Sequence, residues 1–142
     1  MIRLTKEFTF EMAHALDGYE GKCSNLHGHS YHLWVCVEGV KNDANGMVMD
    51  FHRLRLLVQQ SIIESFDHSL LLSKTKENEE VIDFLKKRYG RVHAVDYIPT
   101  TENILEDFAR ILKAVLPANV KLHSLKLQET ETSYAEWFDD LI

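Results

Sequence analysis

The sequence has few cysteines, prolines and glycines, and it has no long apolar run. Its 142 residues include two cysteines, two prolines and six glycines. No apolar stretch approaches the ~20 residues that span a bilayer, and the first residues lack the apolar centre of a signal peptide. We therefore expect a cytoplasmic protein with no membrane partner. In that compartment we expect no disulfide between Cys23 and Cys36.

Linkers are also missing from the sequence. It contains no internal repeat, low-complexity tract or Pro/Gly-rich segment, and its two prolines, Pro99 and Pro117, stand at predicted element boundaries. A length of 142 residues suffices for one compact domain and is too short for two ordinary ones. We expect a single domain over residues 1–142.

Positive charge is in short supply. The 16 Lys and Arg residues are outnumbered by 22 Asp and Glu residues, which gives a formal net charge of -6. Domains that bind nucleic acid usually carry a basic stripe, so we expect no nucleic-acid partner. A small anionic substrate remains compatible with this composition, because a local group of basic side chains can bind it.

Apolar periodicity predicts an α+β protein. Alternation with period two indicates strands with one buried face, and spacing of three to four indicates amphipathic helices. The predicted elements are, in order, residues 2–14, 27–38, 50–66, 76–89, 99–117, 120–128 and 134–138. We expect a four-stranded antiparallel sheet with helices on one face, in β-β-α-α-β-β order. The two edges of such a sheet need cover, so we also expect a homo-oligomer.

Three histidines stand at adjoining ends of the first two predicted strands. His27 and His29 are two residues apart, so their side chains project to the same face of an extended strand. His14 has the apolar parity of the preceding strand and ends it. If the strands form a hairpin, the three imidazoles converge as in a catalytic zinc site with an open fourth position. Iron or nickel also suits these ligands, and the alternative is three unconnected polar residues at strand ends.

Cys23 lies in the polar loop that connects these strands, four residues before His27. As a fourth metal ligand it would make the site closed and structural. As a general base or nucleophile it would act beside an open zinc site. A loop thiol without function is the third alternative.

Asp67-His68 follows the first predicted helix. A carboxylate beside an imidazole can fix its tautomer and raise its basicity. Adjacent residues seldom bond directly, so each of them can instead orient a third group. The alternative is a histidine placed at a helix C-terminus by the helix dipole.

Polar residues also begin the last helix and end the strand after it. Thr100, Thr101 and Glu102 are compatible with simple N-capping. Glu129 shares the inward parity of the apolar residues in its strand, where a carboxylate needs a partner. The paired N–H donors of a heterocycle would suit it, and the alternative is a strand-end glutamate in water.

Together these segments resemble a known family. They are Phe10-Glu11-Met12-Ala13-His14, Cys23-x-x-x-His27-Gly28-His29-Ser30-Tyr31, Gly46-Met47-Val48-Met49-Asp50-Phe51, Asp67-His68, Pro99-Thr100-Thr101-Glu102-Asn103 and Glu129-Thr130. Their order is similar to that of the 6-pyruvoyltetrahydropterin synthase / 6-carboxytetrahydropterin synthase superfamily, over nearly the whole chain. The short gap between Cys23 and His27 is more like the bacterial 6-carboxytetrahydropterin synthases of queuosine biosynthesis than the pyruvoyl enzymes. Residues 129–136 are also similar to the carboxy branch.

The resemblance implies a role for each of these residues. It implies that His14, His27 and His29 hold Zn2+ and that Cys23 is the proton acceptor. Asp67 and His68 would complete a relay with this cysteine across a subunit boundary.

The resemblance also implies a substrate and an assembly. Glu129 would anchor the pterin ring of 7,8-dihydroneopterin triphosphate, in a pocket lined by Thr100, Thr101 and Glu102. The implied products are 6-carboxy-5,6,7,8-tetrahydropterin, triphosphate and acetaldehyde. The implied architecture is the tunnelling fold, in which trimers close a barrel and two trimers stack into a hexamer.

Three features depart from the family pattern. Asn25 stands where the carboxy branch often has a basic residue, Leu72 stands where the family often has Asn, and residues 73–97 are longer and more charged than in compact members. Two other functions stay open. One is a pyruvoyl-forming or side-chain-cleaving pterin enzyme. The other is a non-catalytic zinc- or pterin-binding module, which would need neither Cys23 nor Asp67-His68.

Overall fold

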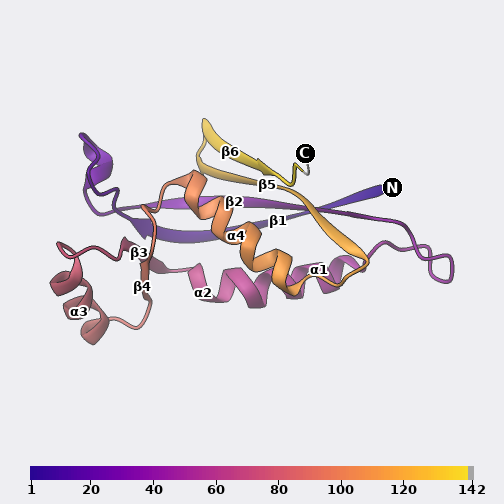
Figure 1. Cartoon of the computed structure of the whole chain (residues 1–142), viewed down its shortest axis with the longest axis horizontal. Helices are drawn as coiled ribbons and strands as arrows, with labels where there is room; N and C mark the ends of the chain where they lie inside the picture. Colours follow the sequence, from indigo (N-terminus) through magenta and orange to yellow (C-terminus); the bar gives the residue numbers. More distant parts are fainter. Residues whose placement is uncertain (141–142) are drawn as a thin grey trace.

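The computed structural model describes residues 1–140 and shows an α+β fold built on one curled, mixed sheet (Figure 1). Six strands pair in the order β4-β3-β1-β2-β5-β6. The strands are β1 (Ile2–His14), β2 (His27–Gly39), β3 (Ser69–Ser73), β4 (Val92–Val95), β5 (Val120–Thr130) and β6 (Ser133–Phe138). The α-helices are α1 (Phe51–Val58), α2 (Glu64–Phe66), α3 (Glu79–Arg88) and α4 (Thr101–Val115). No helix in the described part of the chain is both long enough and apolar enough to cross a membrane.

The long β1–β2 hairpin is the centre of the sheet. Its antiparallel register runs from Ile2 opposite Gly39 to His14 opposite His27. Inward residues of β2 such as Leu33 and Val37 are fully buried. Helices α1, α2 and α4 lie on the same side of the sheet and cover this apolar face (Figure 1). The buried residues of α4 that pack there include Ile104, Leu105, Phe108 and Leu112.

Two helices begin at a residue whose side chain caps them. Asp50 precedes α1, and its carboxylate accepts a hydrogen bond of 2.7 Å from the backbone N–H of His52. Thr100 precedes α4, and its hydroxyl accepts from the N–H of Asn103. Each side chain satisfies a helix N–H that has no partner within the helix. Between α1 and α2 the chain passes through a π-helical turn at Gln59–Ile63, so the predicted helix over 50–66 is continuous but not regular.

The predicted four-stranded antiparallel sheet was wrong in strand number and direction. Strands β3 and β4 were missed, and they extend the sheet in parallel: β3 pairs with β1, and β4 pairs with β3. The physical reason is burial on both faces. β3 contains Leu70-Leu71-Leu72, a short apolar run with no alternation, as is typical of strands in parallel arrangement. The charged segment over 73–97 holds α3 and β4, so it is part of the fold.

The face of the sheet opposite α1, α2 and α4 is polar. On it, Trp34 donates a hydrogen bond of 2.6 Å from its indole nitrogen Nε1 to Glu7, and its ring stacks on His32. Lys126 Nζ lies 4.6 Å from the centroid of the Trp34 ring. The outermost strands, β4 and β6, each pair on one side only within the described chain. These edges are of the kind that oligomerisation can cover.

Candidate functional site

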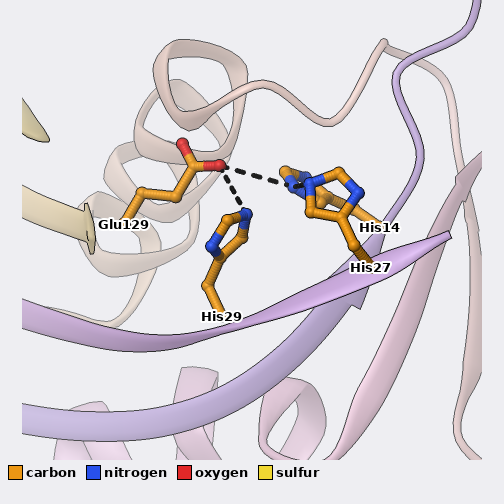
Figure 2. Close-up of side chains that lie close together, drawn as sticks. All are labelled: His14, His27, His29 and Glu129. Atoms are coloured by element: carbon orange, nitrogen blue, oxygen red, sulfur yellow. Dashed lines mark hydrogen bonds and ion pairs between the residues drawn. The ribbon is translucent and has the colours of Figure 1, made fainter. Parts of the chain in front are cut away.

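Three histidines meet where the β1–β2 hairpin ends at the loop 15–26. His14 lies directly opposite His27, and His29 lies opposite Met12, one inward position further along the hairpin. Alternation along both strands places the three imidazoles on the helix-covered face. Figure 2 shows them pointing toward one another and toward Glu129, which comes from β5. The predicted convergence of the two strand ends is therefore confirmed by the register.

Backbone carbonyls orient two of these imidazoles. The Nδ1 atom of His14 lies 2.7 Å from the carbonyl oxygen of Pro99, and the Nδ1 atom of His27 lies 2.7 Å from that of Asn25. A carbonyl oxygen only accepts, so each Nδ1 carries a hydrogen and each ring directs its Nε2 into the cluster. The two Nε2 atoms are 3.2 Å apart. Two lone pairs at this distance repel each other unless a proton or a cation lies between them.

Glu129 completes the cluster. Its Oε1 atom is 2.7 Å from His29 Nε2 and 3.5 Å from His14 Nε2, and its other oxygen accepts a hydrogen bond from the Thr101 hydroxyl (Figure 2). The pKa of Glu129 is lowered to about 2, mainly by its contact with the His14 imidazole. Burial alone would raise this pKa, whereas the hydrogen bond from Thr101 and the nearby His29 lower it further. The carboxylate is therefore ionised at neutral pH.

His29 also has a perturbed pKa. Burial lowers the pKa of its imidazole, and the neighbouring histidines lower it further, while the charge of Glu129 raises it. The net shift is downward, so the ring is neutral at neutral pH. A neutral imidazole is the form that binds a transition metal.

These four residues fit a metal ion. One ligand atom from each of His14, His27, His29 and Glu129 can be chosen so that all lie within 4.8 Å of one another. The two facing Nε2 atoms and the ionised carboxylate beside them can share one cation. Three imidazoles with a carboxylate form a donor set that zinc accepts.

A cavity of about 330 Å³ opens beside the cluster. His14 and Glu129 form part of its wall, and Thr100, Thr101 and Glu102 from the start of α4 form another part. The cavity is thus lined by Thr100, Thr101, Glu102 and Glu129, the four residues to which the family resemblance assigns substrate binding.

Cys23 lies in a short 3₁₀ turn, Lys22–Ser24, within the loop 15–26. It is partly buried, and its carbonyl oxygen accepts a hydrogen bond of 2.9 Å from Leu16. Over residues 1–140, the group of metal-compatible side chains does not include this thiol. The geometry thus argues against a cysteine that closes the site as a fourth ligand.

Asp67 and His68 bond to each other, although adjacent residues seldom do. His68 Nδ1 is 3.0 Å from Asp67 Oδ1, and His68 has a left-handed backbone with φ of 59°. The same carboxylate oxygen accepts a hydrogen bond of 2.9 Å from the N–H of Glu11. This hydrogen bond from the Glu11 backbone is the main cause that lowers the pKa of Asp67, and the contact with His68 lowers that pKa further.

His68 is not among the metal-compatible side chains of its own chain in the described residues 1–140. Its side chain is 73% exposed and lines a second cavity, of about 550 Å³. Glu11 and Ser30 line the same cavity, and they belong to the face of the hairpin opposite His14 and His29. His29 lines this cavity as well, so within one chain His68 shares a cavity with one of the candidate ligands without joining the metal-compatible group.

Two of the departures from the family pattern have structural explanations. Leu72 is buried and packs with Ala15 and Ile82 in a small apolar cluster between β3 and α3, where a polar residue would need a partner. Asn25 contributes its backbone carbonyl to the orientation of His27. Its side chain bonds to the Lys22 carbonyl, which stabilises the turn that carries Cys23.

Tyr31 is a site residue that the sequence reasoning missed. It follows His27 and His29 at the same parity, and this was the available signal. Its ring stacks on Phe10 and lies edge-on to His29, and its hydroxyl is buried with no hydrogen-bond partner in the described chain. Burial and the charge of Glu129 both raise the pKa of Tyr31, so the hydroxyl stays protonated.

We expect Tyr31→Phe to stabilise the metal-free protein by about 1 kcal/mol, because it removes a buried polar group that has no partner. Urea unfolding of the two proteins in the presence of a chelator measures this difference. A loss of stability would instead show that the hydroxyl bonds to a buried water.

The chain resembles proteins of one family along nearly its whole length. A family model described as 6-pyruvoyl tetrahydropterin synthase matches residues 3–139. A 6-carboxy-5,6,7,8-tetrahydropterin synthase from Haemophilus influenzae is 37% identical over 141 residues, which cover 96% of this chain and 99% of the relative. The protein of the same name from Rickettsia felis is 32% identical over 139 residues, which cover 96% and 99%.

Solved structures share the fold. An uncharacterized protein from Wolinella succinogenes superimposes with a TM-score of 0.83 at 22% identity, over 98% of both chains. The Caenorhabditis elegans 6-pyruvoyl tetrahydropterin synthase does so with a TM-score of 0.70 at 21% identity, over 98% of this chain and 96% of the other. At these identities the likeness is one of fold.

Proposed function

The chain belongs to the 6-pyruvoyl tetrahydropterin synthase family, and from this premise we propose that it is a zinc-dependent lyase of the 6-carboxytetrahydropterin branch. Its substrate is 7,8-dihydroneopterin triphosphate. The reaction consumes one water and yields 6-carboxy-5,6,7,8-tetrahydropterin, triphosphate and acetaldehyde. The proposed setting is queuosine (7-deazaguanine) biosynthesis in the cytoplasm. The two relatives named 6-carboxy-5,6,7,8-tetrahydropterin synthase support this branch.

One observation carries the proposal: the metal-compatible cluster and the substrate-sized cavity share a wall. His14 and Glu129 belong to both. A pterin held at Glu129 would have its side chain directed at the metal ligands. His14, His27 and His29 would hold Zn2+, which when bound acts as a Lewis acid that polarises the side-chain hydroxyls and acidifies the adjacent C–H.

The residues of the chain then bind the substrate and move its protons. Glu129 accepts the paired N–H donors of the pterin ring, since its carboxylate is ionised and one of its oxygens is already held by Thr101. Thr100 and Glu102 line the same cavity. Cys23, as a thiolate, removes the proton from the substrate side chain. Triphosphate then leaves by elimination, and the later carbon–carbon cleavage releases acetaldehyde.

Asp67 and His68 complete the proposed relay. Asp67 holds the ring of His68 at Nδ1, which leaves Nε2 free to exchange protons. Because His68 is exposed and does not join the metal-compatible group of its own chain, we place it at the site of a second copy of the chain. The single-sided pairing of β4 and β6 supports a homo-oligomer, for which we propose a dimer of trimers. Sedimentation of the purified protein tests this assembly.

Product analysis tests the function. We expect the zinc-loaded protein, incubated with 7,8-dihydroneopterin triphosphate, to form 6-carboxytetrahydropterin and acetaldehyde in equal amounts, as measured by mass spectrometry. The metal-free protein is the control and should form neither. A pyruvoyl product would support the same site but assign the chain to the 6-pyruvoyltetrahydropterin reaction. Zinc binding without turnover would contradict the lyase assignment.

A further inference from the structure

We propose that Glu129 is a fourth ligand of the metal in the substrate-free protein and that it leaves the metal when the pterin ring binds. This inference rests on the proposed function and deepens it, since it gives one carboxylate two successive partners. The observations behind it are the distances within the cluster, the poor alignment of one contact and the position of Glu129 at a cavity wall.

Two distances within the cluster suit a tetrahedral site that has Glu129 at one corner. Metal–ligand bonds of about 2.0–2.1 Å in a tetrahedral zinc site separate the ligand atoms by about 3.3–3.4 Å. His14 Nε2 and His27 Nε2 are 3.2 Å apart, and His14 Nε2 and Glu129 Oε1 are 3.5 Å apart. Both values lie close to this edge length. The 2.7 Å between His29 Nε2 and Oε1 would have to open by about 0.6–0.7 Å to match this edge length.

The contact between His29 and Glu129 is short and is not an aligned hydrogen bond. His29 Nε2 is buried and has no hydrogen-bond partner in the described chain, although Oε1 of Glu129 is 2.7 Å away. A ring N–H would have to point at the oxygen to be satisfied. An ion bound by both atoms removes this mismatch, because each atom then directs a lone pair at the ion.

Glu129 also stands at the boundary between the cluster and the cavity. Its second oxygen is held by Thr101, on the side of the cavity that α4 forms. Paired N–H donors of a heterocycle would engage both carboxylate oxygens at once. A carboxylate turned toward a ring in the cavity carries Oε1 away from the histidines and off the metal. Binding of the ring therefore breaks the bond between Glu129 and the metal and frees the fourth position at the moment when the substrate side chain arrives.

This exchange would protect the resting site. An open fourth position on zinc binds water and lowers its pKa toward 7. A carboxylate in that position excludes water until the pterin displaces it. The fourth metal position would then become free only when a ligand in the cavity binds the Glu129 carboxylate. Recognition of the ring is thus a condition for access to the metal.

The test uses cobalt(II) as the metal, because its visible spectrum reports the ligand set. We expect Glu129→Gln to weaken cobalt binding at least about tenfold, the lower end of what loss of a metal-site partner costs, and to change the spectrum. Adding 7,8-dihydroneopterin to the wild type should shift its spectrum toward that of the variant. Glu131→Gln, an exposed neighbour on the turn after β5, is the matched control and should match the wild type in both readouts.

A second measurement needs no variant. The infrared difference spectrum of the wild type, with metal minus without, should show a shifted carboxylate band that returns when 7,8-dihydroneopterin is added. Equal cobalt affinity and spectra for wild type and Glu129→Gln, or the absence of a shifted carboxylate band, would overturn the inference. Failure of the proposed function is distinct from this outcome, because it would appear as intact ligand exchange without turnover.

Discussion

Replacing His29 by alanine is expected to abolish stoichiometric zinc binding and to lower turnover by about a thousandfold or more, since Lewis-acid stabilisation supplies several kcal/mol and each 1.4 kcal/mol is tenfold in rate. The variant keeps only two imidazoles and the Glu129 carboxylate, because it loses the imidazole that lies 2.7 Å from Glu129. Metal content and kcat measured on the same preparation check this result.

His32→Ala is the matched control for that experiment. His32 lies on the same strand, three residues further along, and its ring stacks on Trp34 on the opposite face of the sheet. It should leave zinc content and turnover close to those of the wild type. Full zinc content in the His29 variant would refute the assignment of His29 as a ligand.

The second large effect is expected at Cys23. Its replacement by alanine should lower kcat by about 10²–10⁴-fold, the usual contribution of a general base, while zinc content stays unchanged. The structure supports the second half of this expectation, because the metal-compatible cluster in the described chain contains three imidazoles and Glu129 without this thiol. Steady-state kinetics and metal analysis measure the two quantities.

Cys36→Ala is the control, since Cys36 lies on β2 in the part of the strand that pairs with β5, away from the histidines. Two results would contradict the prediction in different ways. Full activity of the Cys23 variant would remove the thiol from the mechanism, and loss of zinc would make it a structural ligand.

The parts of the fold that follow a strict period could be predicted from the sequence. The hairpin β1–β2 alternates over its whole length, and α4 has a regular apolar face between Pro99 and Pro117. Strand β3 has neither signal. Two of its three consecutive leucines, Leu71 and Leu72, are buried by neighbours that come from distant parts of the chain, and no local pattern encodes those neighbours.

The candidate site shows the same division. Convergence of His14 with His27 and His29 follows from strand parity and a hairpin, so it could be predicted. The bond between Asp67 and His68 depends on the left-handed backbone conformation of His68. A non-glycine residue rarely adopts this conformation, and no sequence pattern predicts it here. The carbonyl of Pro99 reaches His14 from 85 positions away, so only the assembled fold shows it.

The carbonyl contacts of His14 and His27 have a consequence for how this site changes in evolution. Both imidazoles are aimed by main-chain oxygens, which every amino acid possesses. Position 25 can therefore exchange its side chain and still orient His27, provided that the turn before β2 keeps its path. The groups that orient these two imidazoles are therefore conserved as a backbone path and not as particular side chains. A sequence alignment, which compares side chains, will underestimate how strictly this path is conserved.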